Sequence, residues 1–189
     1  DDDSVSVIVL NCNRLIFGAP RVPMSTINFK QTPVQLLGDF PKVGQPAPDF
    51  KLVKGDLSEL TLSDLKGKRV VLNTFPSVDT DVCALQLKTF NQKVADIDNT
   101  LVVSASMDLP FALGRFCGAE GVENAITASD FRHRSMAESY GVGVAESPLQ
   151  GLYARSVIIL NESHEIIYAE LVSEVTTEPN YEAAMAALR

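Results

Sequence analysis

The amino-acid sequence predicts an α/β fold in which a mixed central sheet is flanked by helices. The chain has 189 residues, a length that suits one compact domain. Its hydrophobic content of 46% and charged content of 21% lie near the average for globular proteins. Apolar runs alternate with helical patterns along the chain, as they do in βαβ units.

The first predicted element is a small β-hairpin, which is followed by a loop. Two β-like pieces at residues 26–29 and 34–37 are separated by a short polar segment at 30–33, an arrangement typical of a hairpin. Residues 40–50 contain three prolines, which exclude a helix or a central strand. We therefore expect a loop there.

A βαβ unit is predicted next. The apolar runs Arg69–Phe75 and Leu101–Ser106 are typical of buried strands. Thr80 or Asp81 can cap the start of the intervening helix. Apolar side chains recur in that helix at intervals of three and four residues, the spacing of one helix face, and these are Cys83, Leu87, Phe90, Val94 and Ile97.

The C-terminal half is predicted to contain shorter elements. The helices are expected at residues 110–116, 135–140 and 181–188, and two strands at 154–160 and 165–172 flank a hairpin connection at 161–164. The polar residues of this connection are typical of a hairpin loop. The resulting order is a strand, a helix, a strand, two helices, a β-hairpin and a final helix.

Charge and composition exclude several classes of partner. Sixteen Lys and Arg residues stand against 24 Asp and Glu residues, which gives a net charge of −8 and no basic surface for a nucleic acid or an anionic membrane. The longest apolar runs fall well short of the roughly 20 residues that span a bilayer. Three cysteines are too few for a disulfide scaffold, so any function of the cysteines should be chemical. We expect a soluble, cytoplasmic protein.

Residues 1–23 are expected to lie outside the domain, which we place at 24–189. Three aspartates open the chain where a signal peptide needs basic residues, and the apolar run at 7–10 is too short for a signal peptide's apolar region. We interpret this segment as a leader that was translated from upstream or added in cloning. Cys12 is then a bystander.

Cys83 is the first candidate for reactivity. The chain leaves a buried strand, turns at Pro76 and delivers this cysteine into the first turn of a helix, where free N–H groups stabilise a thiolate. Thr80 can place its hydroxyl beside the sulfur, and Pro76 can shield one side from water. Free cysteines are also commonly buried and inert, so position alone leaves both interpretations open.

We expect no metal and no cofactor. His133 and His164 are 31 positions apart, and no cluster of cysteines or carboxylates completes a ligand set at zinc-like spacing. We interpret His133 as a solvated side chain and His164 as a hairpin residue. We assign turn and capping roles to Asp79 and Asp81.

The spacing Pro-x-x-x-Thr-x-x-Cys over residues 76–83 resembles the motif around the peroxide-reducing cysteine of peroxiredoxins. Val43–Phe50 looks like the Gly-x-x-Ala-Pro-Asp-Phe entry segment of that family. Arg115–Gly121 and Glu174–Tyr181 are similar to the resolving-cysteine helix and the C-terminal signature of its bacterial thiol peroxidase branch. The resemblance covers about residues 24–189.

This resemblance to the atypical two-cysteine peroxiredoxins implies a thioredoxin-like fold with an N-terminal hairpin extension. It implies an enzyme that reduces hydrogen peroxide and organic hydroperoxides to water and alcohols and is recycled by thioredoxin. Cys83 would be the peroxidatic cysteine and Cys117 the resolving cysteine of an intrasubunit disulfide. Pro76, Thr80 and Arg155 would complete the site. The family also implies a homodimer, with the active-site loop and the helix at 135–140 as the candidate interface.

Arg155 and Cys117 have other interpretations as well. Arg155 begins a strand run, where a cation needs a partner or a function, but an arginine at a strand edge can also extend into water. Cys117 can be a packed free thiol. If both cysteines lie in helices, their disulfide requires helix ends to unwind, and Gly114 and Gly118 lower that cost.

Two other functions stay open. The chain can be a disulfide reductase or isomerase of the thioredoxin superfamily, which is disfavoured because the second cysteine lies 34 residues after Cys83. It can also be a peroxide-sensing redox relay that passes a disulfide from Cys83 to a client protein.

Overall fold

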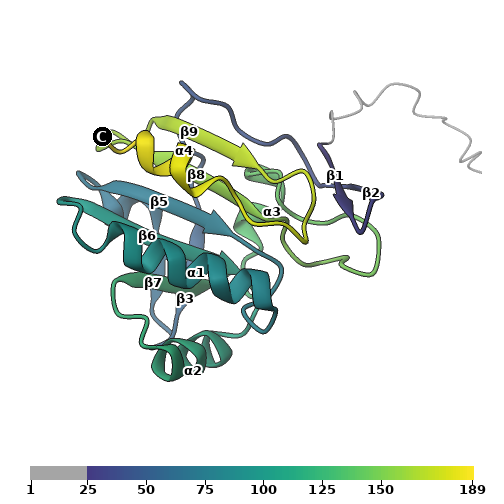
Figure 1. Cartoon of the computed structure of the whole chain (residues 1–189), viewed down its shortest axis with the longest axis horizontal. Coiled ribbons are helices and arrows are strands. Elements are labelled where there is room, and N and C mark those ends of the chain that lie inside the picture. Colours follow the sequence, from purple (N-terminus) through teal and green to yellow (C-terminus); the bar gives the residue numbers. More distant parts are fainter. Residues whose placement is uncertain (1–24) are drawn as a thin grey trace, which may run out of the picture.

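A seven-stranded mixed sheet forms the centre of the computed structural model, which describes residues 25–189 (Figure 1). The strand order is β4-β3-β7-β6-β5-β8-β9. The strands are β3 (Lys51–Lys54), β4 (Glu59–Thr61), β5 (Arg69–Thr74), β6 (Thr100–Ser106), β7 (Ala125–Ser129), β8 (Ser156–Leu160) and β9 (Ile166–Leu171). The predicted leader at 1–23 and Cys12 lie outside the described residues.

Helices cover both faces of this sheet. They are the 3-10 helix η1 (Leu62–Leu65) and the α-helices α1 (Asp81–Val94), α2 (Pro110–Glu120), α3 (Ser135–Ser139) and α4 (Tyr181–Ala186). Successive side chains of a strand point to opposite faces, and β5 shows this clearly. Val71 packs with residues of α1 and α4, which lie on one side in Figure 1, whereas Leu72 packs with Met136 of α3 on the other.

The predicted N-terminal hairpin is confirmed, with a tighter turn. β1 (Thr26–Phe29) pairs with β2 (Thr32–Gln35) rather than with a strand at 34–37. The turn has only two residues because Lys30 and Gln31 both adopt positive φ angles, of 50° and 66°, which is the geometry of a type I′ hairpin turn.

The predicted βαβ unit, the C-terminal hairpin and the predicted helices are also confirmed, with some changes at their ends. α2 continues to Glu120 because Gly121, with a φ of 65°, ends the helix in the left-handed conformation. α1 ends at Val94, so Ile97 lies beyond it. The short strands β3, β4 and β7 were not predicted, and β7 separates the two helices that were expected to be consecutive.

The sheet topology brings distant segments to one edge. β5, β6 and β7 are parallel neighbours, so the loops after them leave the same edge of the sheet, where ligands commonly bind in α/β proteins. β8 runs antiparallel to β5, with Ser156 opposite Thr74. Arg155, just before β8, is therefore close to the loop that leads from β5 into α1.

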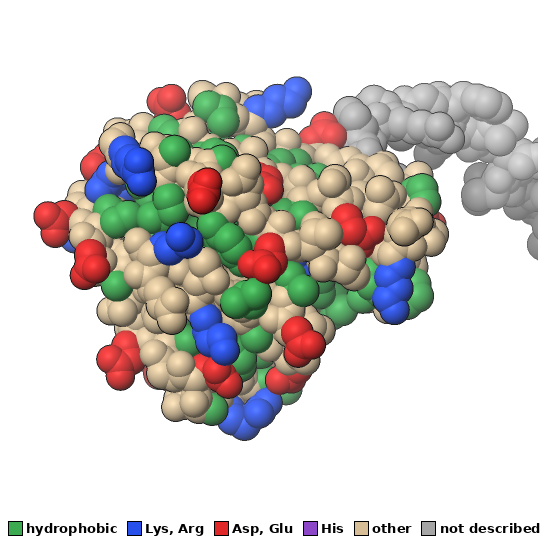
Figure 2. Space-filling model, viewed as in Figure 1, with side chains coloured by type: hydrophobic (Ala, Val, Ile, Leu, Met, Phe, Trp, Pro, Cys, Tyr) green, Lys and Arg blue, Asp and Glu red, His purple; other side chains and the backbone are tan. Residues whose placement is uncertain are grey.

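Two further features concern the described residues alone. No helix within 25–189 combines the length and apolar character needed to cross a membrane. On the face drawn in Figure 2, acidic and basic side chains are interspersed, without a basic patch.

Glu174 attaches the N-terminal hairpin to the C-terminal part of the chain. Its carboxylate accepts hydrogen bonds from the backbone N–H groups of Lys30 (3.1 Å) and Gln31 (3.0 Å) and from Thr176. These hydrogen bonds favour the ionised carboxylate. They lower the pKa of Glu174 from 4.5 to about 2, and the bond from the Gln31 N–H has the largest effect.

We expect Glu174→Gln to lower the melting temperature at neutral pH, because it removes the charged acceptor of this turn. The pKa of Glu174 is lower in the folded than in the unfolded chain, so its contribution is complete above about pH 4.5 and is lost as the pH falls towards 2. Thermal unfolding of both proteins at several pH values measures this. The difference in melting temperature should narrow below pH 4.5, and a constant difference would contradict the assignment.

Candidate active site

Cys83 lies in the first turn of α1. Thr80 is the N-cap residue, and Cys83 is the third residue of the helix, where backbone N–H groups lack helical acceptors and favour a negative charge. The thiol is fully buried in an apolar cluster with Phe75, Val78 and Leu113. Pro76 is buried in the loop that connects β5 to this helix.

The hydroxyl of Thr80 lies beside the sulfur, as the spacing of the two residues suggested. Thr80 Oγ1 is 2.7 Å from Cys83 Sγ and 3.0 Å from the carbonyl oxygen of Ser77. A hydroxyl has one hydrogen to donate. A negative charge on the sulfur favours donation to Cys83, because hydrogen bonds to ionised acceptors are stronger.

Arg155 brings a positive charge into the interior. Its side chain is buried, and Nη2 lies 3.4 Å from Cys83 Sγ. Nε and Nη2 donate to the carbonyl oxygen of Val175 at 3.0 and 2.8 Å, and Nη1 donates to Gln86 Oε1 at 2.7 Å. The interpretation of Arg155 as a strand-edge residue that extends into water is therefore wrong.

Arg155 makes no ion pair with any carboxylate among residues 25–189. Burying an unpaired charge is costly. The only ionisable group that accepts a hydrogen bond from Arg155 in the described chain is the thiol of Cys83. The sulfur of Cys83 is therefore the group that is placed to carry a negative charge opposite the guanidinium.

Gln86 and Val175 were missed at the sequence level. Gln86 is fully buried one turn after Cys83, and its Nε2 lies 3.3 Å from Oδ1 of the buried Asn73 in β5. A polar residue next to the apolar face of α1, together with an asparagine inside a buried strand, is a signal that could have indicated this network. Val175 acts through its backbone carbonyl, which leaves no signal in the sequence.

Cys117 lies in the last turn of α2 and is half-buried. Its Sγ is 3.5 Å from Thr127 Oγ1 in β7, and it packs against the same apolar cluster as Cys83. Both cysteines are free thiols. The two helices that carry these cysteines therefore pack on one apolar cluster. The two sulfurs have different polar neighbours.

The histidines and aspartates lie outside this arrangement. His133 was expected to be solvated, but its Nε2 lies 3.0 Å from Glu59 Oε1, because β3 and β4 bring that carboxylate beside it. His164 is a hairpin residue, as predicted, with a φ of 61°. Asp79 lies 3.4 Å from Arg115, and Asp81 is in the first turn of α1. No group of three metal-ligating side chains occurs within 25–189.

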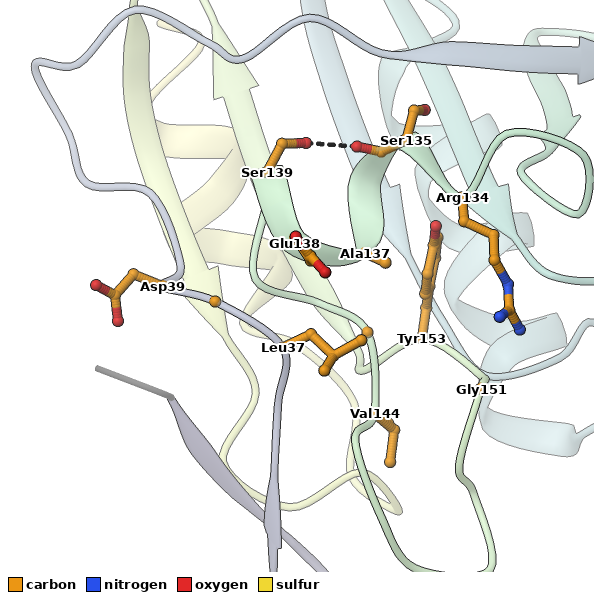
Figure 3. A pocket seen from close by; sticks show the side chains of 12 residues that line it. Leu37, Asp39, Arg134, Ser135, Ala137, Glu138, Ser139, Val144, Gly151 and Tyr153 are labelled. Carbon is orange, nitrogen blue, oxygen red and sulfur yellow. Dashed lines mark hydrogen bonds between the residues drawn. The ribbon is translucent and has the colours of Figure 1, made fainter. Parts of the chain in front are cut away.

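One pocket of the described chain lies apart from Cys83. It has a volume of about 960 Å³ and is formed by α3, the chain after β2 and the loop before β8 (Figure 3). Arg134, Glu138 and Tyr153 are among the residues that line it. None of the five predicted site residues does so.

Comparison with known proteins identifies several relatives. Residues 42–185 match the family described as Redoxin. Thiol peroxidases from two serovars of Leptospira interrogans are each 49% identical over 166 residues, which span 87% of this chain and 97% of theirs.

Two solved structures are similar as well. A peroxiredoxin-like protein from Aquifex aeolicus is 41% identical, with a TM-score of 0.83 over 87% of this chain and 96% of that one. A thiol peroxidase from Chromobacterium violaceum has a TM-score of 0.80 over 86% of this chain and 94% of that one; at 23% identity this likeness concerns the fold alone.

We expect Arg155→Met to slow the reaction of Cys83 with hydrogen peroxide by about tenfold, the usual effect of losing one hydrogen bond from a charged group. Stopped-flow measurement of peroxide consumption by the reduced protein, with Cys83→Ser as the baseline, measures this rate. Arg132→Met, which removes an exposed arginine, is the control. Equal rates in the Arg155→Met and control proteins would remove Arg155 from the site.

Proposed function

The chain belongs to the redoxin family as a thiol peroxidase of the bacterial type, and we propose that Cys83 is the residue that attacks the peroxide. Membership of this family shows the peroxidase activity. The similar solved structure confirms the predicted thioredoxin-like fold with its N-terminal hairpin. One observation supports the choice of cysteine. Cys83 is the ionisable neighbour of a buried arginine that has no carboxylate partner in the described chain.

In the first step, the Cys83 thiolate attacks one oxygen of the peroxide. A sulfur–oxygen bond forms and the oxygen–oxygen bond breaks, which gives a sulfenic acid and, after the leaving oxygen takes up a proton, water or an alcohol. Negative charge moves from the sulfur to the leaving oxygen during this step. Arg155 and Thr80, which already contact the sulfur, are placed to stabilise that charge.

In the second step, the Cys117 thiol condenses with the sulfenic acid. A sulfur–sulfur bond forms and water leaves. A dithiol reductant of the thioredoxin type then reduces this intrasubunit disulfide. Such a cycle needs cysteines that start out as free thiols, which fits a reducing compartment, and we place the enzyme in the cytoplasm.

The second step requires local unfolding. The backbone at both cysteines is hydrogen-bonded: Ala84 N–H donates to the Thr80 carbonyl at 2.9 Å, and Val122 N–H donates to the Cys117 carbonyl at 3.1 Å. A disulfide fixes the two Cα atoms within about 7 Å and orients the two side chains towards each other. We propose that the first turn of α1 and the last turn of α2 unwind to allow this.

We also propose that residues 24–189 form one domain and that two copies form a homodimer, as the family suggests. Three large apolar side chains are exposed near the ends of β6 and β7: Leu109 in the loop after β6, Phe111 at the start of α2, and Phe131 in the loop after β7. Because these parallel strands are neighbours, both loops leave the sheet edge that carries Cys83, and the second loop leads into α3. A second copy that covers this surface would bury them. A mass of one chain in sedimentation equilibrium would contradict the dimer.

We expect Cys83→Ser to abolish peroxide consumption, because no thiolate remains at the site. Cys117→Ser should consume about one equivalent of peroxide rapidly, which leaves Cys83 as a sulfenic acid, and then consume a further equivalent only as that acid is oxidised to a sulfinic acid, without sustained turnover. Stopped-flow measurement of peroxide, with and without thioredoxin, distinguishes these outcomes.

The wild-type protein provides the control. Rapid loss of thiols without thioredoxin, with repeated turnover only in its presence, is the expected result. Sustained thioredoxin-linked turnover by Cys117→Ser would contradict the role of Cys117. Oxidation of Cys83 that is relieved only by a client protein would favour the redox relay.

A further inference from the structure

Asp108 holds the loop that leads into the Cys83 helix. It lies in the connection between β6 and α2, two residues before Pro110 begins α2. Its Oδ1 accepts a hydrogen bond from the hydroxyl of Ser77 at 2.7 Å, and its Oδ2 accepts one from the backbone N–H of Val78 at 2.8 Å. Oδ2 also accepts a hydrogen bond from Ser106 at 2.7 Å, which fixes the carboxylate at the end of β6.

Ser77 connects this carboxylate to the reactive sulfur. While the Ser77 hydroxyl donates to Asp108, the Ser77 carbonyl oxygen accepts a hydrogen bond from the N–H of Thr80 at 3.2 Å and lies 3.0 Å from the Thr80 hydroxyl oxygen. The same Thr80 hydroxyl lies 2.7 Å from Cys83 Sγ. The position of the hydroxyl at the sulfur therefore depends on the conformation of Ser77.

Asp108 precedes α2, the helix that carries Cys117. Its carboxylate therefore joins this helix to the loop before Cys83, and these are the two segments that the disulfide must bring together. Beyond their apolar packing, two ion pairs also link them: Arg115 Nη2 with Asp79 Oδ1 at 3.4 Å and Lys88 Nζ with Glu120 Oε2 at 2.8 Å. Their side chains are exposed, and such surface ion pairs contribute little. Asp108 is half-buried and accepts two hydrogen bonds from the Cys83 segment, so it is the stronger polar link.

We propose that Asp108 is a positioning residue that holds loop 75–80 in the arrangement that reacts with peroxide and releases it before the disulfide forms. This inference rests on the proposed roles of Cys83 and Cys117. While the hydrogen bonds from Ser77 and Val78 hold, Thr80 faces the sulfur and the first turn of α1 stays wound. Once they break, loop 75–80 is free of Asp108, the first turn of α1 can unwind, and Cys117 can reach the sulfenic sulfur.

This link has a consequence for inactivation. A sulfenic acid that waits longer for Cys117 reacts more often with a second peroxide, which transfers one oxygen to the sulfur, leaves as water or an alcohol, and produces a sulfinic acid. The hydrogen bonds of Asp108 favour the first oxidation and oppose the condensation. They therefore lower the peroxide concentration at which the enzyme is inactivated.

The test uses Asp108→Asn, Ser77→Ala and the double variant. Ser77→Ala leaves the bonds of Asp108 to Val78 and Ser106 in place, so it tests the same link with less risk to folding. Asp96→Asn, which removes one exposed carboxylate after α1, is the matched control. Reduced protein is mixed with hydrogen peroxide and quenched in acid at intervals, and mass spectrometry separates the thiol, sulfenic and disulfide forms.

We expect Asp108→Asn to slow the oxidation of Cys83 and to accelerate its condensation with Cys117, each by about tenfold. Ser77→Ala should change both rates in the same directions, and the double variant should resemble Asp108→Asn because both changes break one link. The control should match the wild type. Condensation that is unchanged or slower in both single variants would overturn the inference.

Amide exchange of Val78 in the reduced protein provides a second measurement, which requires no peroxide. NMR should show faster exchange of this amide in Asp108→Asn. Faster exchange with an unchanged condensation rate would leave the peroxidase function intact and remove the role of Asp108. If Cys83 of the wild type did not react with peroxide, the proposed function itself would fail.

Discussion

Arg155 places a positive charge next to Cys83 in the interior, and the geometry of the site follows from the need to accommodate it. The guanidinium is buried, and the neutral oxygens of Val175 and Gln86 satisfy three of its hydrogen bonds. No carboxylate of the described chain pairs with it, so the sulfur at 3.4 Å is the group that can carry the opposite charge. A buried charge of this kind is retained when it serves a reaction.

The fold holds Arg155 from both ends of the chain. Val175, whose carbonyl oxygen accepts two of its hydrogen bonds, is attached through its own N–H to Asn28 of β1. The neighbouring Glu174 binds the turn of the N-terminal hairpin. The hairpin therefore supports the active site, although it lies outside the central sheet (Figure 1).

The sequence predicted the parts of the structure that depend on local patterns. β5, β6 and β8 each contain an apolar run, and α1 shows a helical period. β7 (Ala125–Ser129) was missed because the strand has only five residues. Its burial pattern shows no alternation between buried and exposed side chains. Cys83 and Thr80 could be paired because one helix turn separates them. The contact of Arg155 with Cys83 spans 72 residues and was expected only from the family resemblance.

Amide hydrogen exchange of the reduced and disulfide forms tests the central claim most directly, namely that one peroxide cycle requires local unfolding at the two cysteines. The claim predicts faster exchange in the disulfide form at residues 76–85 and 108–121, with unchanged protection in β5 and β8, because the strands have no reason to move. Identical exchange across both segments in the two forms would mean that the sulfurs already lie within bonding reach in the reduced protein, and would contradict the account.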